Sequence, residues 1–360
     1  MQAQRDHLNR NAGDVEVGVA DLLRQNEMAT AAHHAAPLPA APKWLRTWEM
    51  RRPPLLVECF AEFLGVGIYV FCGVGASATL LITTAAKLTG FGSLLTIGFA
   101  YALGISFAII IAAPTSGGHL SPAFTIAFCL FKGFPWRKAP YYIVSQILGA
   151  MVGALIVAGI FHDQLALITE ELRAVGLGQA VYSAQGPAGL FGLMPAAGQN
   201  LGWAFFNEAI GNIFLAILVF SVLDACNFFV TLSSAPFVIG AGYAVVIWGF
   251  SINSVALNNS RDLGGRIACS IVYGRQCFTA HSGYTAIAAL TTFPATIIGA
   301  GIQTLLLSDS ARMIVNHPPS HTQQVDAINE SRGFQVPSRA VTRESQVFRD
   351  PHTYKSDHSA

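Results

Sequence analysis

The amino-acid sequence predicts an all-α membrane protein with six transmembrane helices, two half-membrane re-entrant helices and an inverted internal repeat. Three observations predict this fold. The 360-residue chain is 52% hydrophobic but only 11% charged, whereas a soluble domain carries about 25% charged residues. Its apolar residues gather in runs long enough to cross a bilayer. Two short polar turns interrupt the apolar sequence at equivalent places in its two halves.

The apolar runs define six predicted spans, because a hydrocarbon core of about 30 Å needs about 20 residues to cross. The spans cover about residues 55–81, 93–113, 140–161, 201–223, 234–253 and 283–307. Two shorter apolar segments, about 122–132 and 259–271, each follow one of the polar turns. A half-membrane helix is tolerated where its backbone packs in protein or lines a cavity, so we expect both segments to be re-entrant.

The order of these segments repeats along the chain as span, span, half-helix, span. Ser121 and Asn258 in the two turns lie 258 − 121 = 137 positions apart, and Glu62 and Glu208 lie 208 − 62 = 146 apart. An odd number of spans in each repeat makes the second copy insert upside down. Inverted repeats place their shared polar site near the membrane midplane.

The predicted membrane domain covers residues 53–309, with repeats over about 55–161 and 201–307 and a linker over 162–200. The flanking segments 1–52 and 310–360 are polar and are predicted to be disordered tails. Lysines and arginines flank the first span and follow the sixth, which places both tails in the cytoplasm by the positive-inside rule. We therefore expect a multi-pass protein, with the plasma membrane as its default location.

Composition and motifs argue against several other classes of protein. The net charge of +1 gives no basic field for a nucleic acid. The sequence shows no nucleophile–base pair, metal-ligand set or phosphate-binding loop in a suitable setting, so we expect no enzyme, no metal and no cofactor. The six cysteines show no close pairing, and we expect no disulfide framework, with Cys269 and Cys277 as inert thiols.

Two half-helices that enter from opposite faces bring their N-termini together at the centre of the bilayer. Each N-terminus offers unpaired N–H groups and about half a positive charge, which repels cations, including hydronium. The extended peptide before each half-helix presents its carbonyl groups to the same space. Donors at the centre and acceptors along the approaches suit water or a small neutral hydroxylated solute.

The two turns resemble the signature loops of the aquaporin and aquaglyceroporin (major intrinsic protein) family. The stretch SGGHLSPAFTIA at 116–127 resembles the first loop, and ALNNSRDLGGR at 256–266 resembles the second. The resemblance covers about residues 55–307. It implies six spans around a pore and a passive channel for water, glycerol or another small neutral solute, assembled in the lipid bilayer as a homotetramer.

The sequence departs from the family at both signature triplets. These triplets are Ser121-Pro122-Ala123 and Asn258-Asn259-Ser260, where the family has Asn-Pro-Ala twice. Serine is a good N-cap residue and Pro122 stays at the first helical position, so Ser121 is expected to cap the first half-helix. Asn258 keeps its amide. The loss of proline and alanine from the second triplet predicts a looser second loop.

The resemblance also implies a constriction near the outer end of the pore. Its arginine is Arg261, which would donate to the solute and repel cations; the alternative is an arginine that snorkels to the interface. Its aromatic residue is Tyr101, for which an interfacial aromatic belt is the alternative. Its second-loop position is Val255, and in the fifth span the register leaves Val246 and Ile247 open. An aromatic, two aliphatic residues and arginine predict an amphipathic opening.

Four further polar residues are expected to hold the two loops. The resemblance implies that Glu62 and Glu208 accept hydrogen bonds from loop N–H groups, and the alternative for a membrane carboxylate is a proton relay. His119 is expected to orient its own loop. Asp262 is expected either to mark a glycerol channel or to act as the structural partner of a nearby arginine.

Two other functions stay open on the sequence alone. A secondary transporter with inverted repeats would need free carboxylates at the midplane to couple an ion. A non-conducting protein with a scaffold or regulatory role would fit if the altered loops close the pore. Neither alternative changes the predicted fold.

Overall fold

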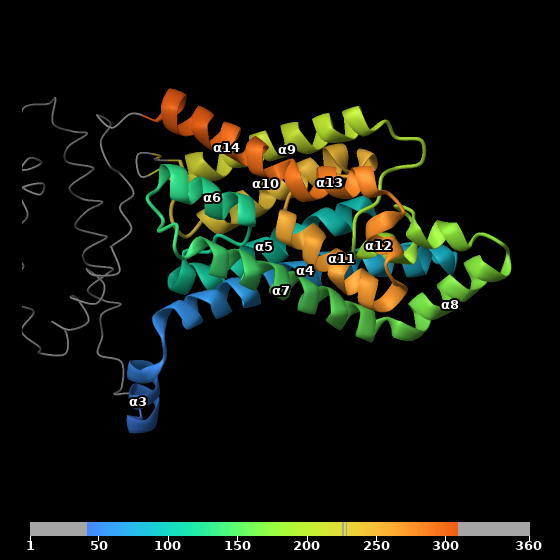
Figure 1. The fold of residues 1–360 in the computed structure, drawn as a ribbon, viewed down its shortest axis with the longest axis horizontal. Coiled ribbons are helices and arrows are strands. Elements are labelled where there is room, and N and C mark those ends of the chain that lie inside the picture. Colours follow the sequence, from blue (N-terminus) through green and yellow to red (C-terminus); the bar gives the residue numbers. More distant parts are fainter. Residues whose placement is uncertain (1–41, 225–226, 228, 309–360) are drawn as a thin grey trace, which may run out of the picture. The chain divides into compact units, whose positions relative to one another are not determined.

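The computed structural model describes residues 42–224, 227 and 229–308, and these residues form helices and loops without a β-strand. Six segments among them are long and apolar enough to cross a membrane (Figure 1). They are Pro54–Ala85 (α4), Leu94–Ser116 (α5), Ala139–Ile160 (α7), Leu201–Val222 (α9), Ala235–Asn253 (α10, Ala235–Phe250, with η4, Ser251–Asn253) and Ser282–Leu307 (α13, Ser282–Leu290; α14, Thr292–Ile302; η5, Gln303–Leu307). The predicted spans match these bounds to within a few residues.

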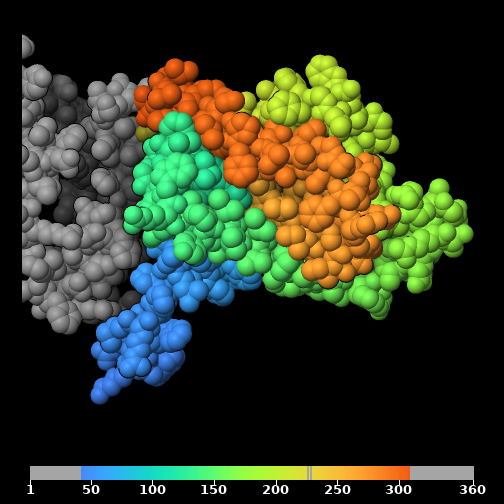
Figure 2. Space-filling model, viewed as in Figure 1, coloured from blue at the N-terminus to red at the C-terminus, as the bar shows by residue number. Residues whose placement is uncertain are grey.

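Two shorter helices follow the polar turns, as the sequence predicts. Helix α6 (Pro122–Phe131) begins after Ser121, and helix α11 (Asn259–Tyr273) begins after Asn258. Helix α6 packs against α7 and α14, and α11 packs against α7 and α13. Figure 2 shows α6 lying directly against the last span on the face in view. Each half-helix is therefore held between spans of both halves of the chain.

The helix packing of the first half is reproduced in the second half. Helix α4 packs against α5 and α7, just as α9 packs against α10 and α14, and α5 packs along α10 across the two halves. Leu120 and Leu257, which directly precede the two N-cap residues, both have a left-handed backbone, with φ of 53° and 58°. These equivalences confirm the predicted all-α fold with six spans, two re-entrant helices and an inverted repeat.

Glycines allow α4 and α7 to approach each other closely. A Cβ atom on Gly149 would lie 2.1 Å from the carbonyl oxygen of Phe63, and one on Gly153 would lie 2.4 Å from the carbonyl oxygen of Gly67. A Cβ atom cannot occupy either place unless the two backbones move apart. This contact positions the first repeat around the two half-helices, since α7 also packs against both of them.

We expect Gly149→Ala to destabilise the protein by about 1–3 kcal/mol, the usual cost of overpacking a tight contact. Gly159→Ala is the matched control on the same helix, because a Cβ there meets no atom within 4 Å. That control is expected to be neutral or to stabilise by up to about 1 kcal/mol. Thermal unfolding of both variants in detergent measures the difference, and equal melting temperatures would contradict this account of the α4–α7 contact.

The long connection between the repeats folds into the membrane domain and is not a bare linker. It contains α8 (His162–Ala174) and two 3-10 turns, η2 (Gly178–Tyr182) and η3 (Pro187–Leu190). Phe191 and Met194, which follow η3, are 0% and 1% exposed. The Tyr182 hydroxyl donates to the carbonyl oxygen of Tyr273 at 2.7 Å. The connection is therefore tied to the C-terminal end of α11.

Two expectations about the fold are wrong. Residues 43–51 form a helix, α3 (Lys43–Arg51), although 1–52 was expected to be disordered. The segment contains no glycine or proline, and the carbonyl group of Pro42 accepts from the first turn. Cys269 and Cys277 form a disulfide, because the chain turns at Gly274 (φ 90°) between α11 and α12 (Gln276–Thr279). The remainder of both tails lies outside the described residues.

Candidate pore and constriction

The two polar turns meet inside the membrane domain. The Asn258 side-chain amide donates from Nδ2 to the carbonyl oxygen of Leu120 at 2.8 Å, which joins the second turn directly to the first. The same side chain accepts through Oδ1 from the backbone N–H groups of Ser260 (2.9 Å) and Arg261 (3.4 Å). Asn258 thus caps α11 and links the two half-helices at their N-termini.

Ser121 behaves differently from Asn258, and the expectation that it caps α6 is wrong. It stands at the N-cap position with extended backbone, but its side chain makes no capping hydrogen bond. Its hydroxyl oxygen is buried and has no partner among the residues that the structure describes. Pro122 and Ala123 follow as the first residues of the helix and are buried. The two turns are therefore chemically unequal at their N-cap residues.

Asn259 and Ser260, the other two departures from the signature, are buried and hydrogen-bonded. Asn259 Nδ2 donates to the carbonyl oxygen of Ala289 in α13 at 2.6 Å. The Ser260 hydroxyl donates to Asn258 Oδ1 at 2.7 Å. Both contacts tie the start of α11 to its surroundings, although a looser second loop stays a prediction because a single conformation does not test it.

Glu62 receives donors from the first turn on both of its carboxylate oxygens. Oε1 accepts from the His119 N–H at 2.9 Å and from the Ser116 hydroxyl at 2.6 Å. Oε2 accepts from the Leu120 N–H at 2.7 Å and from Gln146 Nε2 at 2.8 Å. Because the carboxylate binds the peptide N–H groups of the turn, the carbonyl groups of the turn are free to accept from other partners.

Glu208 repeats this arrangement in the second half of the chain. Its Oε2 accepts from the Ala256 N–H at 2.6 Å, and its Oε1 accepts from the Leu257 N–H at 2.7 Å and from Asn212 Nδ2 at 2.9 Å. The side chain is 0% exposed. Each glutamate therefore binds the two peptide N–H groups that lie directly before an N-cap residue.

His119 lies in a box of aromatic rings beside the first turn. Its ring centroid is 4.7 Å from that of Phe128, 4.4 Å from that of Phe134 and 5.0 Å from that of Tyr142. Its Nδ1 lies 3.2 Å from the hydroxyl oxygen of Thr125. These contacts fix the orientation of the turn against α6 and α7.

Arg261 is buried in the first turn of α11, where its guanidinium group bonds to protein atoms. The side chain is only 4% exposed. Its Nη1 donates to the carbonyl oxygen of Phe191 at 2.7 Å, and its Nη2 donates to that of Leu190 at 3.0 Å. Both its Nε and its Nη2 donate to the Tyr101 hydroxyl. The guanidinium does not snorkel to the interface.

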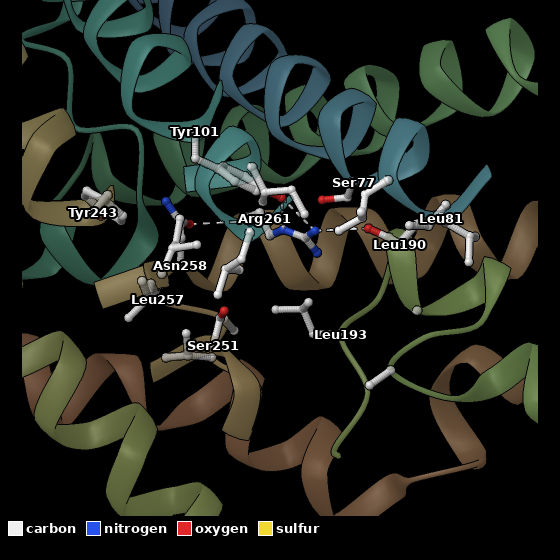
Figure 3. Close-up of a pocket in the computed structure, with 18 of the residues that line it drawn as sticks. Ser77, Leu81, Tyr101, Leu190, Leu193, Tyr243, Ser251, Leu257, Asn258 and Arg261 are labelled. Carbon is white, nitrogen blue, oxygen red and sulfur yellow. Dashed lines mark hydrogen bonds between the residues drawn. The ribbon is translucent and has the colours of Figure 1, made fainter. Parts of the chain in front are cut away.

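A cavity of about 530 Å³ has both Arg261 and Asn258 in its wall (Figure 3). Most of the wall is apolar and comes from α4, α5 and α10, including Leu80, Leu81, Leu94, Ile97, Ile105 and Ile247. The polar groups are few and include the side chains of Ser77, Thr84, Tyr101, Gln185 and Ser251. Such a wall accepts the carbon face of a small solute on one side and its hydroxyl groups on the other.

The cavity separates the two residues that the sequence left as alternatives in the fifth span. Ile247 lines this cavity together with Val255, whereas Val246 does not. A Cβ on Gly211 of α9 would lie 3.1 Å from Val246 Cγ1, so the Val246 side chain points toward α9. Of the two alternatives, Ile247 therefore faces the cavity and Val246 faces α9. Adjacent residues on a helix are about 100° apart, so only one of them faces the cavity.

Asp262 pairs with Arg266 and not with Arg261. Arg266 Nε lies 2.6 Å from Asp262 Oδ2, and both side chains are 0% exposed. Asp262 Oδ1 accepts from the Leu193 N–H at 3.0 Å. Arg266 also donates to the carbonyl oxygens of Cys277 and Leu193. This buried pair holds the connection between the repeats against α11.

Sequence reasoning missed the contribution of the connection between the repeats, residues 162–200, to the constriction. The carbonyl oxygens of Leu190 and Phe191 fix the guanidinium of Arg261, and Gln185 lies in the cavity wall. Backbone carbonyl groups carry no side-chain signal, so the identity of these two residues could not point to this role. The only available signal is the length of the connection, since long ordered loops are often functional.

Asn258→Ala is expected to destabilise the protein by at least about 2 kcal/mol. It removes a helix cap, which costs about 0.5–2 kcal/mol, and leaves the Leu120 carbonyl unpaired, which costs about 1–3 kcal/mol. Ser121→Ala is the matched change in the other turn and is expected to cost less than about 0.5 kcal/mol, because that hydroxyl has no described partner. Thermal unfolding in detergent compares the two, and equal losses would contradict the asymmetry described above.

Comparison with known proteins gives consistent matches over the membrane domain. A family model described as "Major intrinsic protein" matches residues 49–306. Aquaporin-3 of Laccaria bicolor is 41% identical over 280 residues, which cover 75% of this chain and 83% of the relative. Aquaglyceroporin-2 of Rhizophagus irregularis is 35% identical over 229 residues, or 63% of this chain and 69% of the relative. Aquaporin-9 of Homo sapiens is 30% identical over 266 residues, which cover 73% of this chain and 85% of the relative.

A solved structure has the same arrangement of helices. The X-ray structure of the aquaglyceroporin from Plasmodium falciparum superimposes with a TM-score of 0.61 at 25% sequence identity. The match covers 70% of this chain and 97% of that chain. The matched part of this chain is thus similar in fold to almost the whole of that protein.

Proposed function

The chain belongs to the major intrinsic protein family of passive membrane channels, which are not enzymes, and from this premise we propose that its pore conducts glycerol and similar small polyols as well as water. The observation that carries this proposal is the cavity of about 530 Å³ beside Arg261. Water needs only donors and acceptors along its path. An apolar wall opposite a guanidinium suits a solute that has both carbon and hydroxyl faces.

Each polar part of the proposed site has a distinct task. Arg261 donates to a hydroxyl oxygen of the solute and repels cations, while Ile247 and Val255 contact its carbon atoms. Asn258 and the two half-helix N-termini give positive potential at the midplane, which opposes hydronium and metal cations. Glu62 and Glu208 hold the two turns so that this geometry persists.

The contacts of the two glutamates argue against a coupled transporter. An ion-coupled site needs a carboxylate that is free to bind the ion. Each oxygen of Glu62 and Glu208 accepts at least one hydrogen bond from a turn or a neighbouring side chain. The buried donors would lose their partner if either carboxylate took up an ion, so a passive channel is favoured.

Stopped-flow light scattering of proteoliposomes tests the proposed function. Vesicles that contain the protein are expected to shrink faster than empty vesicles in sucrose and to re-swell faster in glycerol. The rate of glycerol entry should rise linearly with the difference in glycerol concentration across the membrane. If neither rate exceeds that of empty vesicles, the channel is non-conducting, and saturable gradient-driven uptake would favour a transporter.

We also propose that the tails, residues 1–52 and 310–360, lie in the cytoplasm and that the chain resides in the plasma membrane. Lysines and arginines near the first span support this orientation. The Cys269–Cys277 disulfide lies at the end of α11 that would then face outside, where disulfides persist. Antibody access to terminal tags in intact and permeabilised cells tests it, and tags accessible in intact cells would reverse the orientation.

We propose a homotetramer in which each chain has its own pore. Helices α9 and α10 expose large apolar side chains around a groove of about 820 Å³ that includes Trp203, Phe206, Phe214 and Phe250. Such a surface fits the apolar face of a neighbouring copy within the bilayer. Light scattering of the detergent-solubilised protein should give four times the 38.3 kDa chain mass, and a monomer mass would contradict the proposal.

A further inference from the structure

The guanidinium group of Arg261 is almost fully engaged by the protein itself. Its Nε and one N–H of Nη2 donate to the Tyr101 hydroxyl, at 3.1 and 2.8 Å. The second N–H of Nη2 donates to the carbonyl oxygen of Leu190, and one N–H of Nη1 to that of Phe191. A guanidinium has five N–H donors, so a single N–H, on Nη1, has no partner among the described residues.

The position of the Tyr101 hydroxyl is set by the packing of its ring. A Cβ on Gly73 of α4 would lie 2.1 Å from Tyr101 Cε1, so the ring rests directly on the backbone of that helix. The carbon atom Cζ of Arg261 lies 5.9 Å from the centroid of the same ring. Figure 3 shows the guanidinium at the cavity wall, with Leu190 on one side and the Tyr101 side chain on the other. The hydroxyl is thus directed at the guanidinium by its surroundings.

We propose that the Tyr101 hydroxyl is a specificity-determining group that competes with the solute for two of the five donors of Arg261. We refer to this hydroxyl and its two hydrogen bonds to Arg261 as the hydroxyl latch. The proposal rests on the function proposed above and concerns the ranking of solutes in the same constriction. A phenylalanine at position 101 would keep the ring but could not accept a hydrogen bond, so both donors would be free for the solute.

The hydroxyl latch affects a polyol more than it affects water. A polyol that enters the constriction must replace the hydrogen bonds that several of its hydroxyl groups made in bulk water, and unreplaced bonds oppose its entry. With the latch formed, the solute finds one free guanidinium N–H and the O–H of Tyr101, which can still donate. A water molecule has fewer hydrogen bonds to bulk water to replace when it enters the constriction. The latch therefore lowers the glycerol-to-water permeability ratio while cations remain excluded by the charge of Arg261.

The test compares Tyr101→Phe with the unaltered protein in proteoliposomes, with water and glycerol permeability measured on the same vesicles. The variant is expected to raise the glycerol-to-water ratio by about tenfold, because hydrogen bonds to a charged group are stronger than neutral ones and about 1.4 kcal/mol is a factor of ten. Tyr243→Phe is the matched control. Tyr243 lines the same cavity but makes none of the four bonds to Arg261 described above. Its replacement frees no donor of Arg261, so the glycerol-to-water ratio should not rise.

The outcomes separate this inference from the proposed function. A ratio that is unchanged or lower in Tyr101→Phe, in vesicles that conduct, overturns the latch and leaves the channel intact. An equal rise in Tyr243→Phe also overturns it, because the effect would then come from a wider cavity. If Tyr101→Phe fails to insert, Tyr101→Leu frees the same donors and must show the same rise. An absence of any flux through the unaltered protein contradicts the proposed function and the latch together.

Discussion

Arg261→Val is expected to raise the permeability to protons and small cations by on the order of a hundredfold. The guanidinium lies at the wall of the cavity and carries the one charge described in that wall. A charge at about 4 Å contributes about 4 kcal/mol at an effective dielectric constant of about 20, and every 1.4 kcal/mol or so is a factor of ten. The helix N-termini at the midplane still oppose cations, so the loss of exclusion is partial. The choice of neutral solutes should broaden as well, because the opening is wider.

Proteoliposomes loaded with a pH-sensitive dye measure this leak under an imposed pH difference. Arg275→Val is the matched control, since Arg275 is an exposed arginine just after the C-terminal end of α11 and does not line the cavity. The control should leak no more than the unaltered protein. An unchanged proton leak and solute profile in Arg261→Val would remove Arg261 from the selectivity constriction.

Arg266→Leu is expected to destabilise the protein by about 3–5 kcal/mol, the usual cost of breaking a buried ion pair by removing one partner. The change leaves the carboxylate of Asp262 buried without its cation. It also removes the donors that serve the carbonyl groups of Cys277 and Leu193. Because this pair holds the connection between the repeats against α11, its loss should lower the melting temperature in detergent and the yield of folded protein.

A second change distinguishes the lost charge from lost packing. Adding Asp262→Asn to Arg266→Leu removes the stranded charge but keeps the oxygen that accepts from the Leu193 N–H. The double variant should therefore be more stable than Arg266→Leu alone. If it is equally or less stable, the ion pair is not the source of the destabilisation.

The fold could be predicted from the sequence because its signals are local and physically strong. Spans need about 20 apolar residues, and the two polar turns stand before segments too short to span. The equivalent placement of Glu62 and Glu208 then fixed the inverted repeat. That these glutamates accept hydrogen bonds from loop N–H groups is implied by the resemblance to the family alone, and the structure shows such a pair of N–H groups before each N-cap.

Several features of the site had no such signal. The choice between Val246 and Ile247 depends on the rotation of α10, which the sequence does not reveal because apolar residues occur on every face of this helix. The Cys269–Cys277 disulfide depends on the turn at Gly274, which brings residues eight apart together. The Ser121 hydroxyl has no partner among the described residues, and Tyr101 bonds to Arg261. Both features depend on tertiary packing, which the secondary-structure preferences of serine and tyrosine do not reveal.

The central claim is that solutes pass through the cavity between Arg261 and the point where the half-helices meet. Thiol block at Val255 tests this claim most directly, because Val255 lines that cavity. Vesicles that contain Val255→Cys are treated on both sides with a bulky methanethiosulfonate reagent, and their water and glycerol fluxes are measured. Val245→Cys is the control, because Val245 is 49% exposed on α10 and lies outside the cavity. The unaltered protein, treated in the same way, is the second control. We expect the water and glycerol fluxes to fall to the level of empty vesicles in Val255→Cys alone. Undiminished flux through the fully modified Val255→Cys protein would contradict it.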